Sequence, residues 1–163
     1  MSHFDRSSLQ AQGFGGFVTF EQLWEMWLDL MSKGAGVYAV LREKDAAPTF
    51  LDRNPGGWFK DRDPTVPIEM LEAKWVEAAY PIYFGKADNL QRRLKEYARF
   101  GRGEKVAHWG GRYIWQLADS ADLVVAWKKC EEDEFALTLE SQLLEEFRVH
   151  YGALPFANIV GPG

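Results

Sequence analysis

Apolar side chains recur along most of this chain at spacings typical of helices and strands, and turn residues separate the segments. Spacings of three and four predict four helices, over about 20–32, 68–78, 89–100 and 131–151. Short apolar segments predict three strands, at 36–41, 81–85 and 121–129. This order of elements is typical of a small α/β fold, an α+β sandwich in which helices flank one sheet.

Local signals mark the ends of several segments. Thr19 and Gln22 have the spacing of a capping box at the start of the first helix. Asp88 or Asn89 can cap the helix that begins near 89. Residues 1–15 are polar and contain glycine, so they are predicted to be a mobile tail.

An insertion separates the first two predicted strands. Residues 42–80 contain four of the seven prolines, and the sequences NPGG at 54–57 and DP at 63–64 have turn chemistry. We therefore predict an inserted surface loop that ends in the short helix at 68–78. Residues 108–119 are predicted to be a loop with a short extended piece.

Composition narrows the class of protein. An apolar content of 47% in 163 residues is ample for one core, and we predict a single domain over 1–163 with an N-terminal tail and helix at 1–35. Cys130 is the single cysteine, which excludes an intrachain disulfide framework and a cysteine-based zinc cluster. No apolar run approaches the roughly 18 residues of a membrane span, and no secretory signal is visible. We expect a cytoplasmic protein that does not enter membranes.

The net charge of −5 is unusual for a protein that binds nucleic acid. The charge is unevenly spread, because residues 84–112 hold eight Lys and Arg against three Asp and Glu. That segment has a balance of +5, and the remainder of the chain carries −10. A basic patch on an acidic body can still attract a phosphate backbone.

The segment from Tyr83 to Arg93 has the residues of an anion site. A strand, a glycine turn and a helix start would leave unpaired N–H groups facing outward, where a phosphate oxygen is stabilised. Lys86 is predicted in the turn, and Arg93 lies one helical turn further on. The alternative is a surface arginine that pairs with Glu96 at i+3.

Glu140 stands out because its neighbours three and four residues away are all apolar: Ala136, Leu137, Leu143 and Leu144. A carboxylate on such a stripe is partly desolvated unless it is paired or binds a metal. It could hold Mg²⁺, which favours carboxylate oxygens and keeps most of its waters. A buried ion pair with Lys or Arg is the alternative.

These phrases together look like the GIY-YIG endonuclease superfamily. The resemblance rests on GVY at 36–38, YFG at 83–85, an arginine ten residues after the second tyrosine and a later helical glutamate, and it covers about 36–158. It implies a small three-stranded antiparallel sheet flanked by helices, and nucleic-acid cleavage that depends on Mg²⁺ (or Mn²⁺). It also implies a set of site residues: Tyr38, Tyr83, Lys86, Arg93, Tyr97, Glu140 and Asn158.

The resemblance implies a role for most of these residues. Tyr38 would help to deprotonate the attacking water, and Tyr83 would support the site by hydrogen bonding. Arg93 would stabilise the pentacovalent phosphate, and Glu140 would be the sole protein ligand of the metal. Tyr97 matches a position that is His or Tyr in the family. Lys86 matches a position that is often basic or polar. Asn158, in PFAN, would close the motif set and buttress the site.

The family pattern is matched with two long intervals. The two tyrosines are separated by 45 positions, so 42–80 must loop out, and the interval from Glu140 to Asn158 is long.

His108 follows the basic helix, and its imidazole could shuttle a proton. A loop histidine without a catalytic role is the alternative.

Two functions follow from these observations. The first is a metal-dependent endonuclease that hydrolyses phosphodiester bonds of nucleic acid, with DNA as the favoured substrate. The second is a non-catalytic module that binds nucleic acid or protein on the same scaffold, with Trp58, Phe59 and Trp75 of the insertion as contact residues. The oligomeric state stays open.

Overall fold

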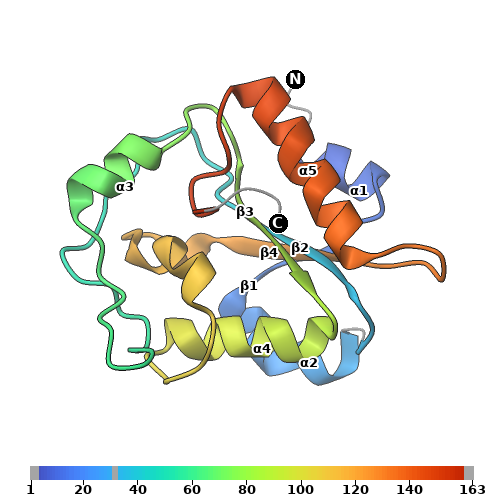
Figure 1. Cartoon of the computed structure of the whole chain (residues 1–163), viewed down its shortest axis with the longest axis horizontal. Helices are drawn as coiled ribbons and strands as arrows, with labels where there is room; N and C mark the ends of the chain where they lie inside the picture. The colour runs from blue at the N-terminus through green and yellow to red at the C-terminus, as the bar shows by residue number, and fades with distance from the viewer. Residues whose placement is uncertain (1–3, 31–32, 160–163) are drawn as a thin grey trace.

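A four-stranded antiparallel sheet lies between two helical layers (Figure 1). The computed structural model describes residues 4–30 and 33–159, except for the side chains of 26–30. The strands lie in the order β1-β4-β2-β3 and are β1 (Gly15–Thr19), β2 (Gly36–Leu41), β3 (Pro81–Ala87) and β4 (Val124–Lys129). The α+β class and the three predicted strands are confirmed, but the three-stranded sheet was wrong because β1 adds a fourth strand at the edge.

Helices cover both faces of this sheet. They are α1 (Arg6–Ala11), α2 (Phe20–Leu30), α3 (Ile68–Lys74), α4 (Leu90–Gly101) and α5 (Ala136–Tyr151), with 3-10 helices η1 (Trp109–Gln116) and η2 (Ser120–Asp122). Helices α1 and α5 pack on one face, and α2 and α4 pack on the other (Figure 1). Within the described chain, no helix has the length and apolarity needed to cross a membrane.

The N-terminal segment is folded over residues 4–19, which corrects the prediction of a mobile tail for 4–15; residues 1–3 of that prediction lie outside the described residues. The Asp5 carboxylate caps α1 by accepting from the Ser8 N–H at 2.8 Å. Phe4 and Leu9 are buried against α5 and the sheet, and β1 pairs with β4. Phe4 and Leu9 are isolated apolar residues in a polar stretch. Their burial in the core is sufficient to hold this segment against the domain.

The predicted starts of the helices are confirmed, with one exception. Thr19 and Gln22 form the capping box, with the Gln22 N–H donating to Thr19 Oγ1 at 3.1 Å. The predicted end of that helix, 31–32, lies outside the described residues. Asn89 caps α4 by accepting from the Arg92 N–H at 2.9 Å. Helix α5, however, begins at Ala136, after the acidic run rather than within it.

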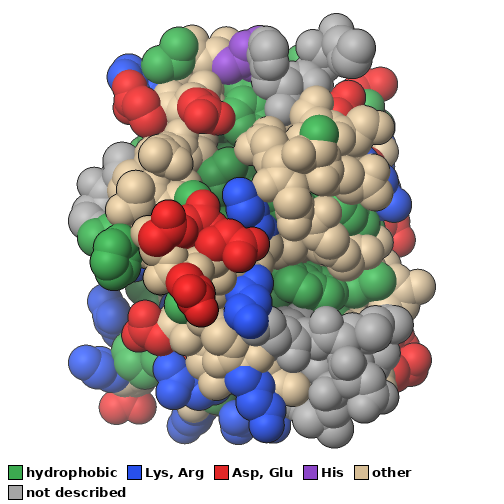
Figure 2. Space-filling model, turned by 90° about the vertical axis from the view of Figure 1, so that its right-hand side faces the viewer, with side chains coloured by type: hydrophobic (Ala, Val, Ile, Leu, Met, Phe, Trp, Pro, Cys, Tyr) green, Lys and Arg blue, Asp and Glu red, His purple; other side chains and the backbone are tan. Residues whose placement is uncertain are grey.

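The acidic run 131–134 forms a turn in the loop between β4 and α5. The Glu131 N–H donates to Glu134 Oε1 at 2.8 Å, which closes the turn. Glu131, Glu132 and Asp133 are exposed. Figure 2 views the molecule from the side on which this loop projects in Figure 1, and acidic side chains gather there in one group. Four of the 24 acidic residues are therefore collected in one place.

The insertion, residues 42–80, is anchored to the domain rather than being a loose surface loop. Buried Gln116 of η1 donates to the carbonyls of Leu51 and Val66 at 2.9 and 2.7 Å. Its amide oxygen accepts from the Val66 N–H at 2.9 Å. Leu71 of α3 is buried in the same core as α4. Segment 108–119, predicted as a loop, forms η1 and then an extended contact between Leu117 and Phe50.

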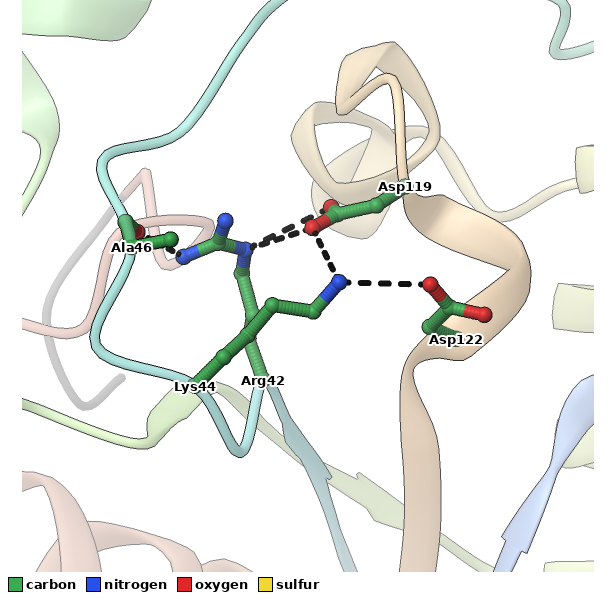
Figure 3. A network of polar contacts seen from close by, with 5 residues as sticks. All are labelled: Arg42, Lys44, Ala46, Asp119 and Asp122. Atoms are coloured by element: carbon green, nitrogen blue, oxygen red, sulfur yellow. Dashed lines mark hydrogen bonds and ion pairs between the residues drawn. The ribbon is translucent and has the colours of Figure 1, made fainter.

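An ion-pair network fixes the start of the insertion at the end of β2 (Figure 3). The buried Arg42 guanidinium contacts Asp119 at 3.0 Å and donates to the carbonyl of Ala46 at 2.7 Å. Lys44 bridges Asp119 and Asp122 at 2.9 and 3.2 Å. Because the carboxylates lie at η2, the network joins the insertion to the segment that precedes β4.

Candidate active site

Three tyrosines, a histidine and an arginine meet on the face of the sheet that α4 covers. The Tyr38 hydroxyl lies 2.8 Å from His108 Nε2. The ring of Tyr97 stacks on His108 with centroids 3.6 Å apart and 3° between the planes. The Tyr83 ring centroid lies 6.0 Å from that of Tyr38 and 5.6 Å from that of Tyr97. Residues from β2, β3, α4 and the start of η1 thus form one cluster, which we call the tyrosine–histidine cluster: Tyr38, Tyr83, Tyr97 and His108.

Two glycines make this packing possible. Gly85 lies opposite Tyr38 in the β2–β3 register, and a Cβ added to it would fall 2.2 Å from the tyrosine ring. The predicted strand ended at Gly85 and Lys86 was predicted in a turn, but β3 continues to Ala87, so Lys86 also lies within the strand. A Cβ on Gly111 would lie 2.5 Å from the Tyr97 hydroxyl, which donates to the Gly111 carbonyl at 2.6 Å.

Arg93 extends from α4 to the cluster and keeps contacts of its own. Its Nη1 donates to the carbonyl of Ala107 and contacts Glu96 Oε2 at 3.1 Å, so the pairing with Glu96 that the sequence left open is present. The side chain is 31% exposed, more than any member of the tyrosine–histidine cluster. Burial lowers the pKa of Arg93, but the neighbouring phenols of Tyr38 and Tyr83 and the Glu96 carboxylate together raise it.

Burial sets the protonation of the cluster. It raises the pKa of Tyr38 well above its ordinary value, although the charge on Arg93 acts in the opposite direction. It also raises the pKa of Tyr83 to about 12. Burial and then the charge on Arg93 lower the pKa of His108 well below its usual value. At neutral pH the phenols are therefore protonated and the imidazole is neutral, so Nε2 can accept the Tyr38 hydrogen.

The N-terminus of α4 is not the open anion site that the sequence suggested. The Leu90 N–H donates to the Gly34 carbonyl at 3.0 Å, and the Arg93 N–H donates to the Asn89 carbonyl at 3.0 Å. The Arg92 N–H is taken by the Asn89 side chain. Since these donors already have partners, any phosphate at this site would be held by side chains.

Glu140 lies on α5, which packs on the opposite face of the sheet, beside edge strand β3. Its carboxylate is 11% exposed and lies 3.5 Å from the Lys86 ammonium, which is 46% exposed. The ion pair that the sequence left open is therefore present. Burial raises the pKa of Glu140 more than Lys86 lowers it. The charge on Glu140 also raises the pKa of Tyr83, so the electrostatic influence of Glu140 extends around the edge of the sheet.

The donor set around Glu140 suits a hard divalent cation. Among the residues that the structure describes, no three His, Cys, Asp or Glu side chains gather at one point. A cation here would have one carboxylate and would keep most of its waters, which is the usual coordination of Mg²⁺. The long contact with exposed Lys86 leaves the carboxylate accessible to such an ion.

Asn158 supports β3 from its outer edge. Its side chain donates to the Phe84 carbonyl at 2.9 Å and accepts from the Phe84 N–H at 3.0 Å. The Ala157 N–H donates to the Ile82 carbonyl at 2.7 Å. The C-terminal segment therefore satisfies backbone groups of the edge strand on both sides of Tyr83, which holds that residue in place.

The structure brings most of the predicted site residues into one region. Tyr38, Tyr83, Tyr97, His108 and Arg93 meet directly, whereas Glu140 and Lys86 form a neighbouring pair. Sequence reasoning missed Gly111 and the carbonyl of Ala107, since backbone contacts of this kind leave no residue-type signal. Comparison of the chain with protein-family models, curated proteins and solved structures finds no match.

Proposed function

We propose that this protein is a divalent-metal-dependent endonuclease that hydrolyses phosphodiester bonds of nucleic acid, with DNA as the favoured substrate, in the cytoplasm. The observation that carries the proposal is the meeting of Tyr38, Tyr83, His108 and Arg93 on one face of the sheet. The Glu140 carboxylate lies across edge strand β3, near enough for its charge to raise the pKa of Tyr83. The motif resemblance to GIY-YIG endonucleases supports the same proposal, because four of the residues that it selects, Tyr38, Tyr83, Arg93 and Tyr97, lie together. Glu140 and Lys86 form their pair on the opposite face of the sheet.

Arg93 is the group suited to the phosphate. It is always protonated, partly exposed and adjacent to both motif tyrosines. A guanidinium in this place stabilises the charge that develops on phosphoryl oxygens during attack. Lys86, which pairs with Glu140 across edge strand β3, is a further exposed cation that can attract the same strand.

The Tyr38–His108 pair is suited to proton transfer. A buried tyrosine whose pKa is raised cannot act as a standing phenolate base at neutral pH. It can pass its own proton to neutral His108 Nε2 at 2.8 Å as it receives one from the attacking water. Burial and the charge on Arg93 disfavour the imidazolium, so His108 returns this proton through Tyr38 to the oxygen that leaves phosphorus, and Tyr38 ends the reaction protonated.

Glu140 is the residue that would hold the divalent ion, with Lys86 beside it. When bound, the ion supplies Lewis-acid stabilisation of the phosphate. The protein holds this carboxylate mostly out of water, which raises its pKa, and places the exposed Lys86 ammonium beside it, which favours the ionised form. Asn158 fixes the intervening strand.

Cleavage assays test this proposal. Purified protein is incubated with supercoiled plasmid and with single-stranded DNA and RNA, with Mg²⁺ or with EDTA. We expect nicking that requires the metal and that falls by at least about a hundredfold in Glu140→Ala and Arg93→Ala. Glu145→Gln, which removes an exposed α5 carboxylate, serves as the control. Equal rates in all variants, or equal rates in EDTA, would refute the assignment.

One observation favours a non-catalytic binding module instead. Tyr38 and His108 are 1% and 0% exposed, so neither contacts solvent as the site stands. In the insertion, Trp58 is half exposed and could contact a partner, whereas Trp75 packs between Phe50 and Phe156. Nucleic-acid binding that persists without any metal-dependent cleavage would favour this second function.

A further inference from the structure

Two arginines that carry the same charge share one tryptophan beside the tyrosine–histidine cluster. The guanidinium carbon of Arg62 lies 4.7 Å from the Trp109 ring centroid, and that of Arg112 lies 4.4 Å from it. Arg62 comes from the insertion, whereas Trp109 and Arg112 belong to η1. Trp109 directly follows His108 in the chain and packs against the core that contains Tyr38, Tyr83 and Tyr97, so the two arginines lie on the same side of the sheet as the tyrosine–histidine cluster.

Neither arginine is neutralised. In the described part of the chain, no carboxylate makes an ion pair with Arg62 or Arg112, although Asp61 and Asp63 flank Arg62 in sequence. Asp63 instead accepts from the Thr65 N–H at 2.9 Å. Burial lowers the pKa of Arg112, Tyr113 acts in the opposite direction, and the charge on Arg62 lowers the pKa further. Its Nη1 donates only to the Trp109 carbonyl, and its buried Nε has no hydrogen-bond partner. Two repelling cations with unused donors are stabilised by an anion.

A strained turn holds Arg62 in this position. Phe59 and Arg62 exchange backbone hydrogen bonds of 3.2 and 3.0 Å around a two-residue loop. Both loop residues have positive φ, 52° at Lys60 and 61° at Asp61, although neither is glycine. This conformation costs free energy for ordinary residues and persists only where the surroundings impose it. The insertion therefore maintains a strained hairpin whose last residue lies on Trp109.

The η1 backbone that carries Arg112 is also held in place by hydrogen bonds. Asn54 of the insertion donates to the Arg112 carbonyl at 2.8 Å, and Tyr97 bonds to the carbonyl of the preceding residue, Gly111. The guanidinium groups cover the ring of Trp109, so the ring itself is poorly placed to stack on a base. The arrangement is suited to a charged, sequence-independent contact.

We propose that Arg62, Arg112 and Trp109 form a second phosphate-binding site, at which the insertion holds the nucleic-acid backbone next to the scissile phosphate. This inference rests on the proposed function and names its substrate contact. The ligand is recognised by its phosphodiester charge, so the site supplies affinity and register without base specificity. The insertion between the first two motif strands thereby acquires a role in substrate binding.

Binding without cleavage tests the proposal. Anisotropy of a labelled 20-base-pair DNA duplex is measured in EDTA from 50 to 200 mM salt, with single-stranded DNA and duplex RNA of equal length in parallel. We expect Arg62→Gln and Arg112→Gln each to weaken binding on the order of tenfold at low salt, and to reduce the slope of log K against log salt by about 1. Arg148→Gln, which removes an α5 arginine already paired with Glu145, is the charge-matched control.

The outcomes separate this inference from the proposed function. If Arg62→Gln and Arg112→Gln bind as Arg148→Gln does, or if the wild type binds none of the three nucleic acids, the second phosphate site is refuted. The cleavage assay decides the nuclease proposal independently. Arg62→Glu adds a folding readout, because pairing with Arg112 should preserve or raise the melting temperature while binding is lost. A lower melting temperature with unchanged binding would assign Arg62 a structural role only.

Discussion

The ring of Tyr97 lies flat on the ring of His108, with 3.6 Å between the centroids and 3° between the planes. Both side chains are fully buried, and the Tyr38 hydroxyl contacts Nε2 at the edge of the imidazole ring. A positive charge on His108 would therefore be desolvated and would face Arg93. The histidine is held neutral by its surroundings, which has a measurable consequence for stability.

Stability should fall as the pH drops below about 6.5, the pKa of an unperturbed histidine. The folded-state pKa of His108 is lowered, so the unfolded state binds more protons in this range, and folding loses free energy until the folded pKa is reached. We expect wild type to lose about 1 kcal/mol relative to His108→Phe between pH 7.5 and 5.5, measured by urea unfolding. Tyr97→Phe keeps the histidine and should follow wild type. A difference that does not change with pH would contradict this account of His108.

Gly85→Ala should displace Tyr38. The added Cβ would lie 2.2 Å from the phenol ring, and neither the ring nor the strand pairing can move without loss of packing. We expect a loss of roughly 1–3 kcal/mol in the free energy of unfolding. Gly15→Ala in β1, where no atom lies within 4 Å of the new Cβ, should change it by less than about 0.5 kcal/mol. Equal stabilities for the two variants would disprove the close contact.

Asn158→Ala should loosen the edge strand. The change leaves the buried N–H and carbonyl of Phe84 without partners, and we expect a loss of roughly 2–4 kcal/mol. Hydrogen exchange is the sharper readout, because the Phe84 amide should lose its protection. Asn89→Ala removes only a helix cap and should cost about 1 kcal/mol without altering exchange at Phe84. Retained protection of the Phe84 amide in Asn158→Ala would contradict this role of the Asn158 side chain.

Glu140→Gln should be at least as stable as wild type at pH 7. The pKa of Glu140 is raised in the folded state, so its ionised form opposes folding at neutral pH, and this effect disappears as the pH falls through the folded pKa. Lys86 stays hydrated when its partner is removed. Glu145→Gln should not gain stability, because Arg148 lowers the pKa of Glu145. A less stable Glu140→Gln at pH 7 would indicate that the carboxylate has a structural role.

Periodicity could predict the elements that carry several apolar residues on one face. It could not predict β1, since Gly16 and Phe17 have positive φ and a bulge interrupts the alternation there. The same limit applies to α1, in which Leu9 is the buried residue. Strand β3 runs two residues past its predicted end because Gly85 pairs with Tyr38 instead of turning.

The candidate site could be predicted as far as residue types and motif order carry information. Tyr38, Tyr83, Arg93 and Glu140 were expected together. The first three lie together, whereas Glu140 pairs with Lys86 on the opposite face of the sheet. The burial of His108 could not be foreseen, because it depends on η1 folding back over Tyr97 through a carbonyl contact at Gly111. The place of Arg62 depends on the whole path of the insertion, and its strained loop at Lys60 and Asp61 carries no glycine to mark it.

A double-mutant cycle on Mg²⁺-dependent DNA cleavage tests most directly whether Arg93 and Glu140 act on one phosphate from the two faces of the sheet. The single-turnover rates of wild type, Arg93→Ala, Glu140→Gln and the double variant are compared, with Glu145→Gln as the control. We expect each single variant to lose most of the rate and the double variant to be little slower than either, since groups that act as one unit are not additive. Independent, multiplicative losses, or a Glu140→Gln rate equal to that of Glu145→Gln, would contradict a shared site.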